Sequence, residues 1–276
     1  MKKYLSKRLD WRRSEIANQY DELPLWSSPF GLLLLDNFPI GEYENYLDIG
    51  SGTGFPLIEI AQRLGSNCKA VGIDPWKAAV NRAKFKIETL ELSYIELIES
   101  DASTIPYPDN YFDLITSNLG INNFRNPLQT LMECYRVIKP NKSLCLTTNL
   151  IGTFSEFYDI FFQTLEELHL PEYADELQKH IKQRGTIELK IDLINQAGFK
   201  LVKQVESEYK MRYLNGTTFL NHSMTLIAFI DSWRNMFTDS EKTLVFDLLE
   251  NRLNEYSKKK GYLELTIPML YLECRK

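Results

Sequence analysis

Short apolar runs alternate with longer amphipathic stretches through the first half of the chain. The apolar runs have the composition of buried strands and span residues 46–49, 69–73, 94–99, 111–118 and 144–149. Between them, stretches such as 57–64 and 126–139 repeat apolar residues at helical spacing, and the second ends at a turn at Pro140. Strands that alternate with helices in this order predict a doubly wound α/β fold with a mostly parallel sheet.

The two ends of the chain have a different pattern. Residues 1–20 are expected to form one amphipathic helix, and Ser28-Pro29 is expected to begin a short one. After residue 150 helical periodicity predominates. The helices expected there span residues 153–168, 172–184, 217–236 and 239–257, with a further one from residue 192 that ends at Gly198. Two long alternating runs, 199–213 and 263–274, are predicted to be strands.

Three glycines at alternate positions follow the first apolar run. Gly50, Gly52 and Gly54 predict a tight turn with positive φ, where the backbone can approach a ligand because glycine has no Cβ. Pro56 then suits the first turn of a helix. A strand, a glycine turn and a helix in this order predict a small-ligand site at the carboxyl end of the first parallel strand. The alternative is a tight turn that binds nothing.

The spacing of these glycines separates two kinds of ligand. The nicotinamide fingerprint G-x-G-x-x-G/A would need glycine or alanine at position 55, which is Phe55. The third glycine stands at position 54 instead, and Asp48 precedes the turn. This D-x-G-x-G-x-G arrangement resembles motif I of the class I S-adenosylmethionine-dependent methyltransferases. The resemblance implies that Asp48 helps to bind the amino group of S-adenosylmethionine. The residues that it places along the methionine part of this cofactor are Gly50, Ser51, Gly52 and Gly54.

Acidic residues end two further strands. Asp74 follows the second apolar run, where a carboxylate can accept hydrogen bonds from both ribose hydroxyls. The resemblance implies that Asp74 and the following Pro75 belong to the cofactor site, and that Asp101 with Ala102 contacts the adenine. Two other interpretations are that Asp74 caps a helix and that Asp101 caps a turn.

The fourth strand and the turn after it resemble motif IV of the same family. Residues 112–115 have the F-D-L-I pattern, and the family places residues beside the reactive methyl group near Asn118. Asn118 is not followed by the Pro-Pro-aromatic sequence of the DNA amine methyltransferases, which argues against that acceptor. Asn122 either contacts the substrate or makes a turn. Asn141 stands where the family has glycine, and asparagine tolerates positive φ.

The resemblance covers about residues 40–150 and is closest to the small-molecule branch that includes the ubiquinone and menaquinone C-methyltransferases. It implies a class I, Rossmann-like fold with a seven-stranded sheet and a helical lid. The expected organisation is a single domain over residues 1–276, with an N-terminal cap at 1–40, a cofactor core at 41–150, and a lid at 151–185 and 214–260. In the cap, Tyr20 and Trp26 either cover the cofactor or pack a helix onto the sheet edge.

The lid supplies most candidates for binding the methyl acceptor. They are Phe157, Tyr158, Tyr213 and Trp233, with Asn122 from the cofactor core. His222 is a candidate general base, because imidazole titrates near neutral pH. The alternative for the aromatic residues is that they form the core of a helical cap. Methyl transfer itself needs alignment and a dry site more than a conspicuous catalytic side chain.

Composition narrows the partners and the compartment. The 276 residues carry a formal net charge of −5, so the chain has no positive field that would attract nucleic acid. No apolar run has the length of a membrane span or the pattern of a signal peptide. The four cysteines are dispersed, which favours free thiols in the cytoplasm over a metal site or a disulfide framework. A homodimer is left open.

These features predict an S-adenosylmethionine-dependent methyltransferase that acts on a small organic acceptor. Two alternatives stay open, namely an NAD(P)-binding oxidoreductase and a non-catalytic module that binds S-adenosylmethionine. Asp48 and Phe55 argue against the oxidoreductase, and the intact glycines and acids argue against the non-catalytic module.

Overall fold

The computed structural model describes residues 2–22 and 25–276; residues 1, 23 and 24, which belong to the expected N-terminal cap, lie outside the described part. The chain divides into two compact units, each built from three separate segments. One, the sheet unit, comprises Trp11–Asn149, Thr186–Ser207 and Met269–Lys276. The other, the helical unit, comprises Met1–Asp10, Leu150–Gly185 and Glu208–Pro268.

The described residues form one seven-stranded sheet. Its strands are β1 (Asn45–Ile49), β2 (Lys69–Asp74), β3 (Ile95–Glu99), β4 (Phe112–Asn118), β5 (Ile138–Asn149), β6 (Lys200–Tyr213) and β7 (Leu263–Arg275). Their order is β3-β2-β1-β4-β5-β7-β6. Neighbouring strands from β3 to β5 pair in parallel, and β7 pairs antiparallel with β5. This topology confirms the predicted doubly wound, mostly parallel α/β fold.

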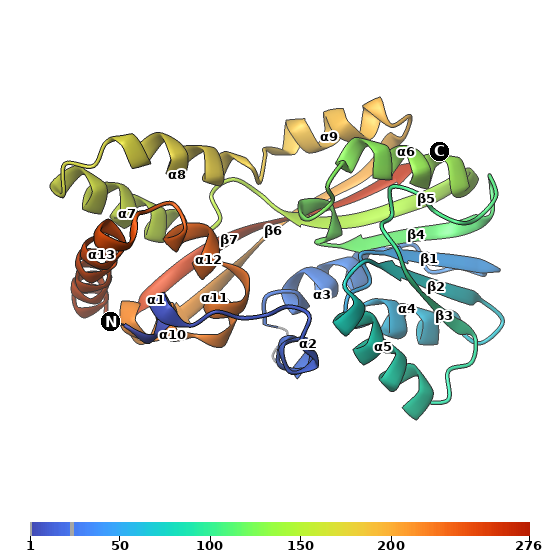
Figure 1. Cartoon of the computed structure of the whole chain (residues 1–276). Coiled ribbons are helices and arrows are strands. Elements are labelled where there is room, and N and C mark those ends of the chain that lie inside the picture. The colour runs from blue at the N-terminus through green and yellow to red at the C-terminus, as the bar shows by residue number, and fades with distance from the viewer. Residues whose placement is uncertain (1, 23–24) are drawn as a thin grey trace. The chain divides into compact units, whose positions relative to one another are not determined.

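Helices cover both faces of the sheet within the sheet unit (Figure 1). On one face lie α6 (Pro127–Val137) and α9 (Ile187–Gln196). On the other face lie α3 (Ser28–Asn37), α4 (Leu57–Leu64) and α5 (Lys77–Thr89). The short α2 (Ser14–Glu22) packs against α5, and a 3₁₀ turn, η1 (Gly120–Asn122), follows β4.

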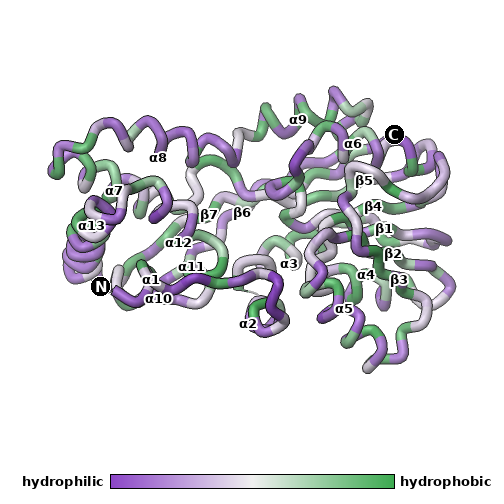
Figure 2. Tube along the Cα trace, in the orientation of Figure 1, coloured by the Kyte–Doolittle hydropathy of each residue, from purple (hydrophilic) through white to green (hydrophobic). Residues whose placement is uncertain are grey.

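Apolar periodicity explains how these layers hold together. In α4, Leu57 and Ile60 are fully buried, whereas Gln62 and Arg63 on the opposite side are exposed. Every residue of β4 is buried, as expected for a central parallel strand with helices on both faces. Figure 2 shows hydrophobic segments in green along these inner elements. The core therefore fixes the carboxyl ends of β1, β2 and β4, where the predicted ligand site lies.

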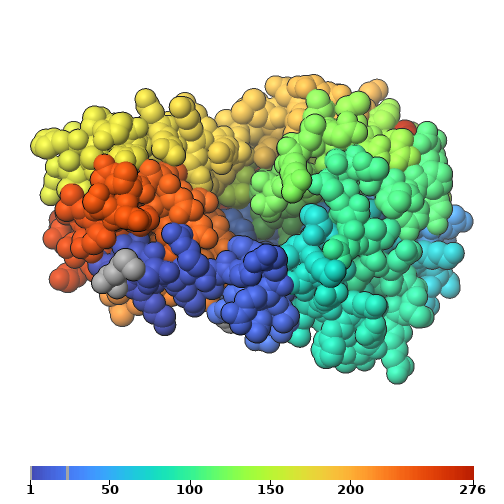
Figure 3. Space-filling view, viewed as in Figure 1, coloured from blue at the N-terminus to red at the C-terminus, as the bar shows by residue number. Residues whose placement is uncertain are grey.

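The helical unit has an aromatic core. Its helices are α1 (Lys3–Ser6), α7 (Ser155–Glu167), α8 (Glu172–Lys182), α10 (Gly216–Asn221), α11 (Ser223–Ala228), α12 (Ile230–Arg234) and α13 (Asp239–Lys260). Phe157, Phe219 and Trp233 are fully buried, and their ring centroids lie 4.4–5.9 Å apart. Figure 3 shows the side chains of α8, in yellow, beside those of α12 and α13, in orange. The three rings therefore pack on one another in the interior of this unit.

Two helix predictions are wrong. The helix expected over residues 1–20 is two helices, α1 and α2. Between them, the carbonyl of Trp11 accepts a hydrogen bond from the indole of Trp76 at 2.6 Å instead of continuing a helix. The helix expected over 217–236 is divided into α10, α11 and α12. The division occurs because His222 is extended (φ −66°, ψ 141°) and its ring caps α11.

The start of β5 also differs from the prediction. The strand begins at Ile138 rather than at residue 144, because Ile138 already pairs with Phe112 of β4. Pro140 and Asn141 therefore lie within β5 and not in a turn that ends a helix. Asn141 has a φ of 62°, in the region that asparagine tolerates better than most residues.

Candidate cofactor site

The glycine turn after β1 has the backbone that its sequence predicted. The φ angles of Gly50, Gly52 and Gly54 are 71°, 52° and 96°. A Cβ at Gly50 would lie 3.1 Å from the Cα of Gly120, so the turn also needs the small residue for close approach to η1. Around Gly52 nothing lies within 4 Å of such a Cβ, which leaves the backbone there open to a ligand.

Asp74, at the end of β2, is tied to this turn. Its Oδ2 accepts the backbone N–H of Gly52 at 2.9 Å, and its Oδ1 accepts that of Trp76 at 2.7 Å. The bond to Trp76 is the helix-start contact that the capping interpretation predicted. Burial raises the pKa of Asp74 above its usual value, although both backbone hydrogen bonds oppose the shift. A carboxylate still has lone pairs left for further donors when it accepts one N–H on each oxygen.

Asp48 of β1 lies fully buried behind the turn. Its Oδ1 accepts the hydroxyl of Thr116, whereas its Oδ2 has no hydrogen-bond partner among the described residues. Burial raises the pKa of Asp48 to about 7, and the neighbouring charge of Asp74 adds to the shift. An unpartnered buried carboxylate oxygen of this kind would gain from a cationic donor.

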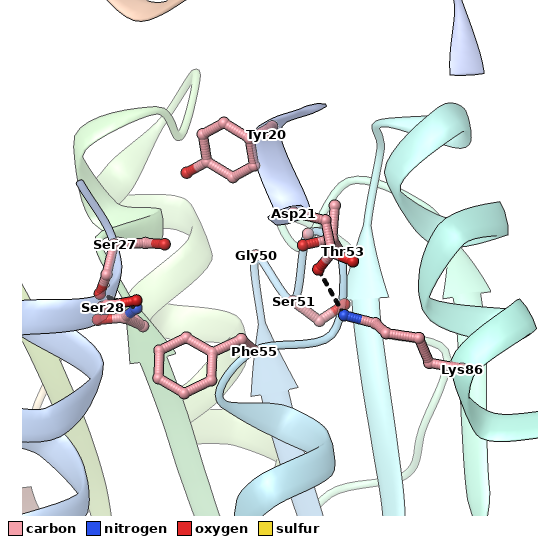
Figure 4. A pocket seen from close by; sticks show the side chains of 11 residues that line it. Tyr20, Asp21, Ser27, Ser28, Gly50, Ser51, Thr53, Phe55 and Lys86 are labelled. Atoms are coloured by element: carbon pink, nitrogen blue, oxygen red, sulfur yellow. Dashed lines mark hydrogen bonds and ion pairs between the residues drawn. The ribbon is translucent and has the colours of Figure 1, made fainter. Parts of the chain in front are cut away.

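A cavity of about 420 Å³ opens beside the glycine turn (Figure 4). This volume lies in the range of small-molecule sites. The predicted residues that line it are Tyr20, Gly50, Ser51, Gly52 and Asn118. Six lining residues were missed, namely Asp21, Ser27, Ser28, Thr53, Phe55 and Lys86. Seven predicted residues do not line it: Trp26, Asp48, Gly54, Asp74, Pro75, Asp101 and Ala102.

An ion cluster forms one wall of the cavity. Asp21 of α2 accepts hydrogen bonds from Lys86 at 2.5 Å and from Arg82 at 2.7 Å, both on α5. Figure 4 shows the Lys86–Asp21 contact beside Thr53. Burial would raise the pKa of Asp21, but these hydrogen bonds outweigh it and hold that pKa below its usual value. The paired charges come from segments more than sixty residues apart in the chain, so no local sequence motif predicted their contact.

Two aromatic rings, those of Tyr20 and Phe55, form another part of the wall. Tyr20 lies edge-on to Trp76, with ring centroids 5.7 Å apart. Trp26, which does not line the cavity, packs against Phe30 at the same distance. The ring of Phe55 lies against Gly31 of α3, where a Cβ would come within 2.1 Å of the Phe55 ring. Gly31 is therefore required for the position of a side chain that lines the cavity.

The ends of β3 and β4 carry the other predicted residues. Asp101 Oδ1 accepts the backbone N–H of Ser103 at 2.8 Å, which is the contact of a turn cap. Asn118 donates from Nδ2 to the carbonyl of Ser27 at 3.1 Å and accepts the Thr147 hydroxyl at 2.7 Å. Asn118 thus joins β4, β5 and the start of α3 at the cavity.

A second polar cluster follows β4, and sequence analysis found only one of its members. Asn122 accepts the hydroxyl of Thr148 at 2.6 Å and donates to Asn149 Oδ1 at 2.8 Å. Lys190 of α9, buried to 8% exposure, donates to Asn122 at 3.4 Å. Among the described residues no carboxylate forms an ion pair with Lys190, and desolvation lowers its pKa. A single lysine in an otherwise ordinary helix gave no signal in the sequence.

The remaining candidates lie in the helical unit. The indole of Trp233 donates to the hydroxyl of Tyr158 at 3.0 Å, and Phe157 packs on Trp233. His222 Nδ1 accepts the backbone N–H of Met224 at 3.2 Å, and its ring lies edge-on to Tyr213. Burial lowers the pKa of His222, which favours a neutral imidazole. Its Nδ1 is thereby occupied in capping α11.

Comparison with known proteins decides the family. Residues 40–216 match the family described as "Methyltransferase domain". The chain belongs to this methyltransferase family. Its fold and the resemblance in its glycine turn make it a class I member, for which S-adenosylmethionine is the cofactor. Membership favours the predicted class over an NAD(P)-binding oxidoreductase.

Relatives and solved structures agree with this family. The chain is 35% identical to a demethylmenaquinone methyltransferase of Oceanobacillus iheyensis over 122 residues, 43% of this chain and 51% of that protein. It thus spans about half the length of the curated relatives it matches. A SAM-dependent methyltransferase from Aquifex aeolicus superimposes with a TM-score of 0.52 at 23% identity, covering 72% of this chain and 93% of that one.

A protein of different chemistry shares the fold. The [4+2]-cyclase SpnF superimposes with a TM-score of 0.55 at 17% identity, and 95% of each chain is covered. The fold by itself therefore does not specify the reaction. Within the described part of the chain, no helix has the length and apolarity needed to cross a bilayer. In that part, no three His, Cys, Asp or Glu side chains are grouped so as to hold a metal ion.

Proposed function

We propose that this protein transfers the methyl group of S-adenosylmethionine to a small organic acceptor. The observation that carries the proposal is the pairing of an open glycine turn with a buried acid behind it. Gly52 exposes backbone to the cavity, and Asp48 keeps one carboxylate oxygen without a partner in the described structure. A ligand with an ammonium group and hydrogen-bonding oxygens suits this donor set.

Each predicted residue has a role in this proposal. Asp48 binds the ammonium group of the cofactor, and the glycine turn lies along its methionine part. Asp74 accepts the ribose hydroxyls through the lone pairs that remain after each oxygen has accepted one backbone N–H, from Gly52 and from Trp76. Asp101 and Ala102 contact the adenine. Pro75 is proposed to belong to the cofactor site beside Asp74. The residues proposed to border the methionine end are Tyr20, Trp26, Ser51, Gly54 and Asn118.

The bound cofactor supplies an electrophilic methyl group on a sulfonium. The protein then has to align the acceptor in line with the breaking bond and to keep water away. Asn118 is held on both sides by Ser27 and Thr147, so it presents a rigid edge at the carboxyl end of β4. A rigid edge at this place favours alignment over proton transfer as the contribution of the protein.

The acceptor is proposed to be a small molecule with an apolar body. The similarity to demethylmenaquinone methyltransferases supports an organic acceptor of this kind. The aromatic residues proposed to bind it are Phe157, Tyr158, Tyr213 and Trp233. Asn122 is a further candidate contact. His222 is proposed as a base only for acceptors that lose a proton. Its lone-pair nitrogen is Nδ1, which accepts the Met224 N–H, so it would have to release that hydrogen bond to take up a proton.

The partners and the compartment follow from composition. The net charge of −5 argues against nucleic acid as a partner. The four cysteines are free and buried, which supports a reducing compartment such as the cytoplasm. No contact in the structure bears on a homodimer, which stays a prediction.

Calorimetric titration tests the proposal. Wild-type protein is titrated with S-adenosylmethionine, S-adenosylhomocysteine and NADH, and the Asp48→Ala and Asp74→Ala variants are titrated in parallel. We expect the first two ligands to bind and NADH not to bind. Each variant should lose about tenfold or more in affinity, since a hydrogen bond to a charged group is worth about 1.5–3 kcal/mol. Asp36→Ala, at an exposed carboxylate of α3, is the matched control and should bind as wild type does.

Binding of NADH alone would overturn the class. Unchanged affinity in both variants would overturn the assignment of the site while leaving the class standing. Turnover is then measured by release of S-adenosylhomocysteine from a panel of small acceptors. Tight cofactor binding with no release on any acceptor would favour a non-catalytic module.

A further inference from the structure

Three polar side chains of the helical unit meet beside its aromatic core. Tyr158 lies on α7, His180 lies on α8, and Arg184 follows the end of α8 (Figure 1). The guanidinium of Arg184 lies over the Tyr158 ring at 5.6 Å, and the His180 ring lies 6.2 Å from that of Tyr158. Tyr158 itself is almost completely buried, at 2% exposure.

The hydrogen bonds of this cluster are short of acceptors. The hydroxyl of Tyr158 accepts the Trp233 indole N–H at 3.0 Å and an N–H of Arg184 at 3.2 Å. Both lone pairs of Tyr158 are thus used, while its own proton has no acceptor among the described residues. The second terminal nitrogen of Arg184 and Nε2 of His180 are buried and also have no described partner.

Unmet donors of this kind are costly. A buried polar group without a partner costs about 1–3 kcal/mol, and more when it is charged. Two such groups, together with a Tyr158 proton that has no described acceptor, indicate that an acceptor from outside the chain belongs there. One oxygen group with several lone pairs could accept from Tyr158 and Arg184 together.

Charge points to the same conclusion. The helical unit contains five arginines, and four of them have a carboxylate partner. These are Arg8 and Arg234 with Asp231, Arg212 with Glu264, and Arg252 with Glu167. Arg184 alone has none within 4.0 Å among the described residues. Burial and the charge of Arg184 lower the pKa of His180 to about 4, so His180 adds no second charge at neutral pH.

We infer that Tyr158, His180 and Arg184 bind the carboxylate of a small organic molecule. Arg184 supplies the opposite charge, and the Tyr158 hydroxyl donates the second hydrogen bond. Neutral His180 donates a third hydrogen bond in the tautomer that carries its proton on Nε2. The inference rests on the cluster alone and does not depend on the proposed function.

Binding measured with matched probes tests this inference. The protein is saturated with S-adenosylhomocysteine and titrated with benzoate, 2-naphthoate and octanoate, and with the primary amide of each acid. We expect at least one acid to bind about tenfold more tightly than its amide. Arg184→Gln should abolish this preference, Arg184→Lys should keep most of it, and Tyr158→Phe should reduce it severalfold.

Arg252→Gln is the matched control, because it removes an equal charge from the same unit at a residue already paired with Glu167. It should leave the preference unchanged. Circular dichroism of each variant shows whether it is folded, and Tyr158→Phe keeps the buried ring if Arg184→Gln does not fold. The inference is wrong if no acid is preferred over its amide, if Arg184→Gln keeps the preference, or if Arg252→Gln loses it as well.

The same titrations separate this inference from the proposed function. Saturation with S-adenosylhomocysteine is measured first in every sample. If the wild-type protein does not bind S-adenosylhomocysteine, the result counts against the proposed function. Normal S-adenosylhomocysteine binding with no preference for any acid overturns only the role of the cluster, whose missing acceptors would then be water molecules.

Discussion

The hydroxyl of Thr116 on β4 donates a hydrogen bond to Oδ1 of Asp48 on β1, and a hydrogen bond joins the same hydroxyl to that of Tyr46. This contact satisfies one oxygen of a fully buried carboxyl group and leaves the other without a described partner. Burial of this group raises its pKa to about 7. Two pH-dependent properties of the protein follow from it.

The first property is the free energy of unfolding. Because the folded protein holds the proton of Asp48 more tightly than the unfolded chain does, Asp48 stabilises the fold fully below pH about 4. This stabilisation is lost as the pH rises through about 7. The loss is on the order of 4 kcal/mol at most. Urea denaturation at pH 4.5 and 7.5 measures the change in the free energy of unfolding between the two pH values. Asp48→Asn should remove the part of this change that comes from Asp48. Asp36→Asn should show the same pH-dependent change as the wild type. An equal change in wild type and Asp48→Asn would refute the assignment.

The second property is the affinity for S-adenosylmethionine. If the ionised form of Asp48 binds the ammonium group, the affinity of the wild-type protein should rise between pH 5.5 and 7, and binding should release a proton. Calorimetry in two buffers of different ionisation enthalpy measures that proton. Asp48→Asn should bind more weakly, without this pH dependence. Proton release that survives in Asp48→Asn would locate the titrating group elsewhere.

The contact between Gly31 and Phe55 predicts an unusual cost for alanine in a helix. Alanine normally gains about 1 kcal/mol over glycine there. At Gly31 the new Cβ would meet the Phe55 ring at 2.1 Å, so overpacking should turn the gain into a loss of about 1–3 kcal/mol. The displaced ring should also weaken S-adenosylhomocysteine binding, since Phe55 lines the cavity. Thermal unfolding and calorimetry measure the two effects.

Two variants control that experiment. Gly41→Ala places a Cβ at an ordinary 3.5 Å from Tyr43 and should be nearly neutral. Adding Phe55→Leu to Gly31→Ala should recover stability, because the smaller side chain removes the clash. A loss of stability that Phe55→Leu does not relieve would mean that Gly31 matters for another reason.

Lys190 provides a test of a buried charge. Its pKa is lowered by desolvation, so the unfolded chain binds more protons than the folded one above the folded pKa. The contribution of Lys190 to the free energy of unfolding therefore rises as the pH increases from the pKa of Lys190 in the folded protein toward 10.5. Lys190→Met should stabilise the protein at pH 7 by about 1 kcal/mol or more and flatten this rise. Lys200→Met, at an exposed site on β6, should do neither in chemical denaturation.

The sequence predicted those parts of the site that depend on neighbours in the chain. Gly50, Gly52 and Gly54 adopt positive φ because their local turn demands it, and Asp74 ends β2 because the strand pattern ends there. The order of strands and helices similarly determined the parallel sheet. These features need no knowledge of which distant segments meet.

The rest of the site depends on distant segments. Asp21 of α2 contacts Lys86 of α5, and Tyr158 of α7 contacts Arg184 after the end of α8. Nothing in either local sequence specifies the partner. The division of the helix expected over 217–236 was missed for a related reason. His222 uses its ring to cap a new helix, which an apolar period does not reveal.

The division of the chain into interleaved segments has a consequence for its biosynthesis. Residues 269–276 belong to the sheet unit and pair with β5, in a register that joins Arg275 to Ser143. Everything between residues 208 and 268, which belongs to the helical unit, is translated before them. On the ribosome the cofactor cavity can therefore assemble around β1, β2 and β4 while β5 still has an open edge. That edge closes only after the whole helical unit has emerged, and until then it is the surface a nascent-chain chaperone would need to protect.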